Sequence, residues 1–566
     1  MKNAFFYVLF YLLLTIVLAP AWANILHVPS EYSSIQSAVD SSQSGDTVLI
    51  ANGTYFEQTV IANKTVMIGG RFLLTHDSLD ISATTITIPD SIRYYDGVNR
   101  SVISVLPNSV VWLNGITVRG GYGYRQYNPV VNTYGGSIFA DTCSIFIDHC
   151  HIIHGTAYGG GGFGSYFCRW VSVNHSRVDS CYGTNAGYGG GGMDIQNCDS
   201  CRVENSTIVN NYHVGWAGGF GIGANQFGYV NNCIISNNIA VQGWGGGIFE
   251  NVGTVSNCVV DGNLSASEAG IVVACYTGSP VISGEISGNV FRNNRKTMSA
   301  THLPGASALS LTSYSSGTWL IENNTFENNI DSNVYAEAVL EVQRANVLVK
   351  RNRFIGNTSI RWAVFYGFNA AHPTFDSNFV MNNIGNSLFA SYTSTSPMVF
   401  THNDFILNRG LAIKSLDGYP TAISAQYNYW GDPSGPSSST NLTGLGDTLP
   451  DYVTYLPFLT APLFPDAAPD EGKETRLLPK TAHLLNVHPN PFNATLTIDF
   501  IVNKMTVLDL SIFDVTGRFV TQLSNRKYST GTHSISYNSK FLPSGVYFIR
   551  MSSHNNIETN KVVLLK

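Results

Sequence analysis

The sequence predicts an all-β protein in which a right-handed parallel β-helix is followed by a small antiparallel β-sandwich. Recurrence is the first observation, because five times between residues 134 and 263 an aromatic residue runs into a glycine cluster. A short apolar segment with an Asn-rich corner follows, as in residues 205–211. Such segments return about every 25 to 35 residues, the range of stacked repeats. They start at residues 150, 175, 205, 232, 257, 288, 323, 351, 377 and 402.

The content of one repeat is the second observation. Each repeat has short runs rich in Val, Ile and Phe, separated by Gly and Asn, and such runs are typical of strands. One repeat cannot bury its own apolar face, so it must stack on its neighbours. Asn and Gly at the corners suit a positive φ, and stacked Asn side chains are expected to hydrogen-bond from coil to coil. A propeller is the alternative, but its antiparallel blades require longer units and hairpin turns.

Residues 1–23 are predicted to be a secretory signal peptide. Lys2 supplies a positive charge, residues 4–18 are almost wholly apolar, and residues 21–23 (Ala-Trp-Ala) form a small-x-small cleavage site. The apolar run is short for a membrane span, and no later stretch of the sequence is long and apolar enough to cross a bilayer. The mature protein is therefore expected to begin near Asn24, to work outside the cytoplasm and to keep no membrane span.

Residues 24–460 are predicted to form the β-helix with an N-terminal cap. Ile35, Ala38 and Val39 share one helical face, and a short helix there would cover the open end of the solenoid. The opening, from Ile25-Leu-His-Val-Pro to Gly53-Thr-Tyr, resembles that of pectate-lyase-like β-helix proteins. This resemblance implies the fold but not the activity, because lyases, hydrolases, esterases and binding proteins share it.

Two further resemblances mark the repeats and their end. The Gly246-Gly-Ile and Phe-x-x-Asn motifs resemble those of bacterial polymorphic outer-membrane proteins and related surface β-helices. Residues 427–436, which include Trp430, resemble the Asn-x-Trp-Gly signature that often ends such helices. We expect Trp430 to cover the last coil and the Gly-Pro turn after it to stop further stacking.

The C-terminal part divides into a linker and a sorting domain. Residues 461–483 are rich in Pro, Ala, Asp, Glu and Lys, which is typical of a linker. Residues 484–566 alternate apolar and polar side chains between turns, which predicts the antiparallel sandwich. This tail resembles the C-terminal sorting domain of type IX secretion cargo. The residues that carry the resemblance are Asn490, Pro491, Phe492, Asn493, Gly517, Gly545 and Tyr547.

The tail's resemblance implies a Gram-negative bacterium of the Bacteroidetes and Chlorobi kind, with the type IX secretion machinery as a partner. The mature protein is then expected to be secreted or tied to the outer-membrane surface. Charged residues make up 12% of the chain and the net charge is −6, so there is no basic face for nucleic acid. We expect a monomer.

The nine cysteines all lie between residues 143 and 275. Cys143, Cys168 and Cys198 keep the same distance from a segment start, so they should stack on consecutive coils, as should Cys233 and Cys258. Interior ladders of small apolar side chains are the favoured interpretation. Disulfides between coils are the alternative, since the compartment allows them.

A group of histidines follows Asp148 and would permit a metal site or an acid–base pair. Alternation places His149 and His151 on one face, which is expected to be solvated. No metal and no cofactor are therefore assigned. The remaining members of the group are His154 and His175.

Charged residues in the later repeats are interpreted as surface charge. Three of them precede segment starts on successive coils, which predicts an exposed ladder of alternating charge. These are Glu322, Lys350 and Asp376. A second group holds the basic residue that a lyase would need, but no acidic cluster accompanies it. Its members are Arg292, Arg295 and Lys296.

The aromatic residues before the glycine clusters are the candidate ligand-binding residues. Aligned along one edge they would form a row that can stack on the apolar faces of sugar rings, with the glycines leaving open space beside each ring. Structural stacking between coils is the alternative. The predicted ligand-binding residues are Tyr158, Tyr188, Trp216 and Trp244.

No catalytic residue is assigned. The chain contains neither Asp-Asp nor Gly-His-Gly, which hydrolases of this fold use, and the acids of the repeats are scattered. The favoured function is a non-enzymatic adhesin or polysaccharide-binding scaffold, secreted or at the cell surface, with polysaccharide as its partner. The alternative is a polysaccharide lyase or glycoside hydrolase that acts on uronate-rich glycans.

Overall fold

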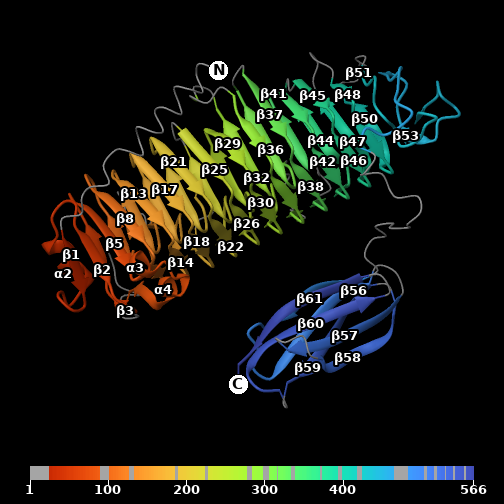
Figure 1. Ribbon diagram of the computed structural model, residues 1–566. Helices are drawn as coiled ribbons and strands as arrows, with labels where there is room; N and C mark the ends of the chain where they lie inside the picture. The colour runs from red at the N-terminus through yellow and green to blue at the C-terminus, as the bar shows by residue number, and fades with distance from the viewer. Residues whose placement is uncertain are drawn as a thin grey trace. The chain divides into compact units, whose positions relative to one another are not determined.

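The structure is a computed structural model of the 566-residue chain (Figure 1). The chain forms two compact units, which divide between Pro465 and Asp466. The structure describes residues 24–88, 101–125, 133–184, 189–223, 227–276, 279, 283–297, 305–314, 317–332, 338–369, 372–392, 398–416, 423–464, 482–502, 506–514, 519–529, 531–539, 542–553 and 556–565.

The first unit is a parallel β-helix, as predicted, in which each strand pairs with the matching strands of the coils before and after it. Sheet A has 16 strands and runs the length of the unit. Its strands are β1 (Ile25–Val28), β2 (Thr47–Ile50), β5 (Thr65–Gly70), β8 (Val110–Asn114), β13 (Ser144–Asp148), β17 (Trp170–Asn174), β21 (Ser200–Glu204), β25 (Phe227–Asn231), β29 (Val252–Ser256), β33 (Glu285–Ser287), β37 (Thr318–Glu322), β41 (Asn346–Lys350), β45 (His372–Asp376), β48 (Val399–Thr401), β51 (Ile423–Ser424) and β54 (Val453–Thr454).

Sheet B has 13 short strands that follow those of sheet A after a turn. Its strands are β3 (Gly53–Phe56), β6 (Thr84–Thr87), β9 (Thr117–Arg119), β14 (His151–Ile153), β18 (Arg177–Asp179), β22 (Thr207–Val209), β26 (Ile234–Ser236), β30 (Val259–Asp261), β34 (Val290–Arg292), β38 (Thr325–Glu327), β42 (Arg353–Ile355), β46 (Phe379–Met381) and β49 (Asp404–Ile406).

Sheet C completes each coil with two rows of strands that join at β47 (Ile384–Tyr392). The row of two-residue strands is β15 (Thr156–Ala157), β19 (Tyr182–Gly183), β23 (Tyr212–His213), β27 (Ile239–Ala240), β31 (Leu264–Ser265), β35 (Arg295–Lys296), β39 (Ile330–Asp331) and β43 (Thr358–Ser359). The other row is β4 (Thr59–Ile61), β7 (Ile103–Val105), β12 (Ile138–Asp141), β16 (Phe163–Tyr166), β20 (Met193–Gln196), β24 (Phe220–Gly223), β28 (Gly247–Glu250), β32 (Ile271–Cys275), β36 (Leu309–Ser313), β40 (Leu340–Gln343), β44 (Trp362–Phe368), β50 (Arg409–Ser415), β53 (Gly446–Thr448) and β52 (Pro436–Ser437).

The ends of the β-helix are covered by local elements. Helix α2 (Ile35–Ser41) begins at an N-cap serine and buries Ile35, Ala38 and Val39, so the predicted cap helix is confirmed. Two short helices, α3 (Phe72–Thr75) and α4 (Ser78–Ala83), and a hairpin of β10 (Tyr124–Arg125) and β11 (Thr133–Tyr134) interrupt the early coils. Trp430 is fully buried and stacks on Phe405 at 4.5 Å. Pairing nevertheless continues past it, because β54 still adds to sheet A.

Asn side chains form two ladders inside the solenoid, which confirms the predicted coil-to-coil hydrogen bonds. In each rung the side-chain oxygen accepts from the backbone and side-chain N–H groups of the preceding rung, as between Asn289 and Asn324 at 2.9 Å each. The ladder between sheets A and B comprises Asn289, Asn324, Asn352, Asn378, Asn403 and Asn428. The ladder after sheet B comprises Asn211, Asn238, Asn263, Asn294, Asn329, Asn357, Asn383 and Asn408.

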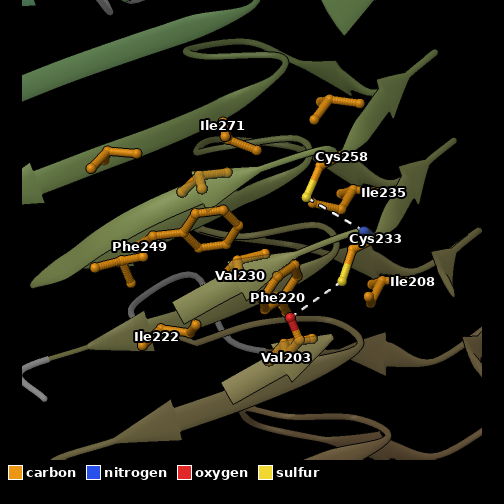
Figure 2. Close-up of a cluster of buried hydrophobic side chains, with 14 of the residues drawn as sticks. Val203, Ile208, Phe220, Ile222, Val230, Cys233, Ile235, Phe249, Cys258 and Ile271 are labelled. Atoms are coloured by element: carbon orange, nitrogen blue, oxygen red, sulfur yellow. Dashed lines mark hydrogen bonds between the residues drawn. The ribbon is translucent and has the colours of Figure 1, made fainter. Parts of the chain in front are cut away.

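Cysteines and serines take the place of Asn between sheets A and B in the earlier coils. Figure 2 shows Cys233 and Cys258 on neighbouring coils among buried aliphatic and aromatic side chains; the Cys233 N–H donates to the Cys258 sulfur at 3.5 Å. At a different turn, between sheets C and A, Cys143 and Cys168 stack as predicted, with their Sγ atoms 3.5 Å apart. All nine cysteines are buried and form no disulfide, which supports the interpretation as interior ladders.

The second unit consists of two small antiparallel sheets. One contains β55 (Ala482–His488), β56 (Thr495–Val502) and β59 (Gly531–Asn538), and the other β58 (Phe519–Tyr528), β57 (Thr506–Asp514), β60 (Gly545–Ser553) and β61 (Asn556–Leu564). Alternate side chains such as Leu496, Ile498 and Phe500 of β56 form its core. The predicted small antiparallel fold after the β-helix is therefore confirmed. Within the described ranges, the helices are too short or too polar to cross a membrane.

Candidate functional site

Four of five neighbouring strands of sheet A, from β8 to β25, carry aromatic side chains on their outer surface, and the remaining strand, β21, carries Arg202. The second and fourth residues of each strand are buried in the core, as Val111 and Leu113 are in β8. The first, third and fifth residues therefore point outwards. The third positions are in register across the five strands. Their residues are Trp112, Phe146, Ser172, Arg202 and Tyr229.

Aromatic and cationic groups on this surface contact one another. The rings of Trp112 and Phe146 stack with centroids 5.1 Å apart and an interplanar angle of 9°. The guanidinium carbon of Arg202 lies 4.9 Å from the centre of the Tyr229 ring. Trp170 is half-buried at the first position of β17. These five residues are referred to below as the sheet-A aromatic face.

A polar row borders the sheet-A aromatic face at the fifth position of each strand. It comprises Asn114, Asp148, Asn174, Glu204 and Asn231. The Asp148 carboxylate accepts hydrogen bonds from the side-chain amides of Asn114 at 3.1 Å and Asn174 at 3.0 Å. Aromatic rings beside amide and carboxylate groups can bind the apolar face of a sugar ring and its hydroxyl groups together.

Sequence reasoning missed this face, although a signal for it exists. In Val110-Val-Trp-Leu-Asn114 a large aromatic residue stands between two buried aliphatic residues, a pattern that alternation places outside the coil. Phe146 has the same position in Ser144-Ile-Phe-Ile-Asp148. The aromatic residues next to glycine clusters were the more conspicuous repeat, and they direct attention to a different part of the coil.

The predicted ligand-binding residues lie at a corner beside sheet C. Tyr158, Trp216 and Trp244 are half-buried there, and Tyr188 falls outside the described residues. The rings of Trp216 and Trp244 meet edge to face with centroids 4.5 Å apart and pack on a small apolar cluster. Tyr158 meets Tyr134 in the same way at 6.1 Å. The structure thus brings Trp216 and Trp244 together, and their binding of a ligand stays a prediction.

The glycines beside these rings have a different role from the one expected. A Cβ atom on Gly161 would lie 2.5 Å from the carbonyl oxygen of Gly191. A Cβ atom on Gly191 would lie equally close to the Gly218 carbonyl oxygen, and one on Gly218 to the Gly245 carbonyl oxygen. No side chain fits at such a distance. The expectation of open space beside each ring is therefore wrong, because the missing side chains let one coil's backbone lie against the next.

A buried acid and a buried imidazole lie close to the glycines of this corner. Asp194 in β20 accepts a hydrogen bond of 2.5 Å from the Tyr166 hydroxyl, and burial raises the pKa of both groups. Burial lowers the pKa of His213 to about 4. Asp194 is 2% exposed and His213 fully buried, so neither side chain contacts a polymer on the surface. Both are polar groups of the interior, and no catalytic role is assigned to them.

One residue of the predicted basic surface group is not on the surface. Lys296 is fully buried, donates to the carbonyl of Gly305 at 3.0 Å and lies 3.8 Å from the carboxylate of Asp331, which is also buried. The interpretation of Lys296 as a surface charge is therefore wrong. It belongs to the inward-facing position of the two-residue strands, whose neighbours are small or polar.

The predicted ladder of alternating charge is confirmed at the turn between sheets A and B. Glu322, Lys350 and Asp376 are in register at the ends of β37, β41 and β45. The Lys350 ammonium lies 3.5 Å from the Asp376 carboxylate. These groups remain partly exposed, so each ion pair contributes little to stability.

The histidines near Asp148 lie on different surfaces, which corrects the expectation of a shared face. His149 occupies the turn after β13, whereas His151 opens β14 of sheet B. Asp148 pairs with Asn174, so the first repeat segment begins one residue earlier than its sequence spacing indicates. His149 and His175 therefore occupy the same turn position in consecutive coils. Their ligand atoms and an oxygen of Asp148 all lie within 4.8 Å of one another, an arrangement that can hold a metal ion.

The predicted sorting-signal residues have structural roles in the second unit. The Asn490 side-chain oxygen accepts from the Val563 N–H at 2.8 Å, and Phe492 is buried beside it with its N–H donating to the Val563 carbonyl. Tyr547 is buried and its hydroxyl donates to a carbonyl at 2.9 Å. Pro491 and Asn493 flank Phe492 on the surface, Gly545 opens β60, and Gly517 lies outside the described residues.

Comparison with known proteins identifies the tail. Residues 486–565 match the secretion system C-terminal sorting domain. No curated protein matches the chain. Among solved structures, the chain is similar to full-length tailspike protein 2 from Escherichia coli O157:H7 bacteriophage CAB120, at 10% identity and a TM-score of 0.22, covering 93% of this chain and 65% of the tailspike. It is also similar to the PL6 family alginate lyase AlyGC, at 11% identity and a TM-score of 0.15, covering 76% of this chain and 84% of the lyase.

The match to the sorting domain indicates that the protein is exported by type IX secretion, to the medium or to the cell surface. The β-helix precedes this sorting domain in the exported chain.

Proposed function

We propose that this protein is an exported β-helix that binds polysaccharide without cleaving it, at the outer membrane surface or after release. The sheet-A aromatic face carries this proposal. Trp112 and Phe146 stack in parallel there, and Trp170 and the Arg202–Tyr229 pair lie on the neighbouring strands. The expected partner is a glycan chain lying across the coils, since successive strands repeat the same outward positions about every 4.8 Å.

The chemistry of the face supports a sugar ligand over a protein partner. Aromatic rings offer flat apolar surfaces for the C–H groups of a pyranose ring, and the bordering amide and carboxylate groups offer donors and acceptors for its hydroxyls. Arg202 adds a cation that can pair with a uronate or sulfate group. A protein interface of ordinary size would instead bury a wide apolar core surrounded by a polar rim.

Binding without cleavage is supported by where the perturbed acids lie. Burial raises the pKa of Asp194, Asp404 and Asp447. The side chains of Asp194 and Asp404 are buried. Asp447 lies on β53 of sheet C, where it accepts from Asn408, and not on the sheet-A aromatic face. A general acid for glycoside cleavage must reach the scissile bond. The sheet-A aromatic face holds Asp148 and Glu204 at its edge, and each is already paired there with an amide or a cation.

The test uses the mature full-length chain with paired substitutions on a glycan array. Replacing Trp112 and Trp170 by Ala should weaken binding at least about tenfold, or about 1.4 kcal/mol. Replacing Tyr276 and Tyr314, an exposed aromatic pair elsewhere on the β-helix, serves as the matched control and should leave binding unchanged. Circular dichroism of each variant reports the folded fraction to which binding is normalised.

A third variant, with Trp216 and Trp244 both replaced by Ala, compares the two candidate surfaces. Loss of binding in this variant alone would move the site to the corner beside sheet C. New unsaturated or reducing ends, measured on every glycan that binds, would overturn the non-enzymatic part of the proposal in favour of a lyase or hydrolase. Absence of binding across acidic and neutral glycans would overturn the whole proposal.

A further inference from the structure

We propose that Asp148, His149 and His175 form a binding site for a transition-metal ion of the zinc class, at the turn between sheets A and B. This inference rests on its own geometry and does not depend on glycan binding. The backbone builds the site first. Asp148 and Asn174 are paired at the ends of β13 and β17, so the residues that follow them, His149 and His175, stand directly above one another in consecutive coils.

The two imidazole rings are held in place from several sides. His149 and His175 have φ angles of 51° and 43°, so the same left-handed turn aims both side chains the same way. Their rings stack with centroids 4.6 Å apart and an interplanar angle of 21°. On its other face His149 stacks against Phe72 of α3 at 4.7 Å. The rings are thus positioned by the fold before any ion binds.

Both rings direct the same nitrogen at one carboxylate. The Nδ1 atom of His149 lies 2.9 Å from one oxygen of Asp148, and the Nδ1 atom of His175 lies 3.3 Å from the other. Ligands about 2.0–2.2 Å from a tetrahedral zinc ion stand roughly 3.3 Å apart. The nitrogen–oxygen spacings therefore already suit an ion between the rings and the carboxylate. A modest tilt of the rings, which are partly exposed, completes the approach.

Hydrogen bonds between neighbouring Asn side chains fix how the Asn174 amide faces the two proposed ligands Asp148 and His175. The side-chain amide of Asn205 donates to the Asn174 oxygen at 2.8 Å, which orients the Asn174 NH₂ group towards Asp148 and His175. That NH₂ group lies 3.0 Å from the carboxylate and 2.8 Å from the His175 Nδ1. The His175 Nδ1 accepts from this NH₂ group, and the same lone pair is the one that would coordinate an ion. A cation bound between His175 Nδ1 and the carboxylate oxygen, which lie 3.3 Å apart, would replace the hydrogen bond from the Asn174 NH₂ group to His175.

The donor set selects the class of ion. Two imidazole nitrogens and one carboxylate oxygen suit zinc, cobalt, nickel or copper, whereas calcium and magnesium prefer oxygen ligands alone. Asn114 and Asn174 hold the carboxylate through hydrogen bonds, the kind of outer support that tunes metal sites. The side chains of His149 and His175 are 35% and 47% exposed, which leaves a coordination position for water.

A second histidine at the same turn provides a matched control. His402 lies 3.6 Å from Asp376, but the Lys350 ammonium lies 3.5 Å from the same carboxylate. This pair has one imidazole and already has a cation, so it should not bind a divalent ion. The variants His149→Asn, His175→Asn and His402→Asn are suited to the fold, because Asn205 and Asn232 occupy the equivalent turn position with positive φ in the next coils.

The experiment titrates the untagged, chelator-treated mature chain with Zn²⁺ by calorimetry and with Co²⁺ by visible absorption. We expect one ion per chain, with affinity reduced at least about tenfold in His149→Asn and in His175→Asn and unchanged in His402→Asn. Melting curves of the metal-free variants show that each is folded. Absence of one-equivalent binding, binding that survives His175→Asn, or an equal loss in His402→Asn would overturn the proposal. Glycan binding of His175→Asn is measured in parallel, so that a failure of the metal-site proposal and a failure of the proposed glycan binding are observed separately.

Discussion

The coils before Cys275 and those after Glu285 share one backbone path but fill it differently. In the later coils the position between sheets A and B is Asn in every rung, and Phe291, Phe326 and Phe354 stack inside at 4.9 and 4.7 Å. In the earlier coils the same position holds Ser or Cys, as at Ser206 and Cys258. A solenoid repeat therefore fixes positions and not residue types.

The difference between these halves coincides with a difference on the outside. The sheet-A aromatic face and the histidine pair both belong to the earlier coils. The later coils carry the charge ladder at the equivalent turn instead. In the later half both turns that flank sheet B carry an Asn ladder, whereas in the earlier half only the turn after sheet B does, from Asn211 onwards. The earlier half holds both proposed binding sites.

The largest expected effect comes from breaking the amide ladder. The Asn352 oxygen accepts from the Asn324 backbone at 2.9 Å and from its side chain at 3.0 Å, and its own NH₂ donates to the Ile321 carbonyl. In Asn352→Ala the Asn324 N–H and the Ile321 carbonyl lose this partner. The Asn324 NH₂ group keeps its hydrogen bond to the Ile286 carbonyl. At about 1–3 kcal/mol for each of the two buried groups, we expect a loss of roughly 2–6 kcal/mol in the free energy of unfolding. Urea denaturation followed by circular dichroism measures it.

The matched change in the earlier half is Cys258→Ala at the equivalent position. Its sulfur accepts one long contact, the 3.5 Å bond from the Cys233 N–H. We expect a loss of about 1–2 kcal/mol, because one weakly bonded group is stranded and a small volume is removed. Equal losses for Asn352→Ala and Cys258→Ala in the same denaturation series would contradict the proposed difference between the halves.

The next effect concerns Asp447, which ends the Asn ladder that follows sheet B. Asp447 accepts from the Asn408 side chain at 2.7 Å, and burial raises the pKa of its carboxyl to about 7. A raised folded-state pKa favours the folded protein while the carboxyl is protonated. Stability is therefore highest near pH 4 and falls as pH rises to about 7. Because Asp447 is only half-buried, we expect this loss to be about 1–2 kcal/mol.

Asp447→Asn tests this titration, since an amide oxygen can continue the ladder without ionising. The variant should be more stable than the natural chain at pH 8 and should lack this part of the stability change between pH 4 and 7. Unfolding free energies measured at several pH values in both chains provide the comparison. An unchanged pH profile in Asp447→Asn would show that another group is responsible.

Much of this architecture follows from the sequence because it is repeated. The Asn corners, the short β-branched runs and the amphipathic Ile35–Val39 stretch each have one physical interpretation, and all three are found in the structure. The sorting tail carries ordered motifs and is matched as a whole. Repetition makes the prediction reliable because a turn or strand misassigned in one coil is corrected by the matching positions of the other coils.

Features that depend on exact register were harder to predict. Ile152 and Ile153 are both apolar, but only Ile152 pairs with Val178. Counting from Ile153 therefore misplaced the first segment by one residue and hid the stacking of His149 on His175. Lys296 is predicted from the sequence to be a surface charge because its strand has only two residues, and alternation between inward and outward side chains cannot be recognised in so short a strand. The glycine clusters suggested space for a ligand, whereas Gly191 and Gly218 allow close contact between coils.

The smallest effect, and the one that separates the two halves most simply, concerns the thiols. All nine cysteines lie in the earlier coils and are buried without disulfides. Burial raises the pKa of Cys150 and Cys181 to about 12, so the reactive thiolate is scarce at neutral pH even when a reagent arrives. Native protein treated with iodoacetamide should therefore stay unlabelled, and protein unfolded in urea without a reductant should label at all nine positions. Mass spectrometry counts the labels. Sites that remain blocked in urea until a reductant is added would show disulfides between coils, and rapid labelling of native protein would show that the earlier coils open far more readily than their buried ladders allow.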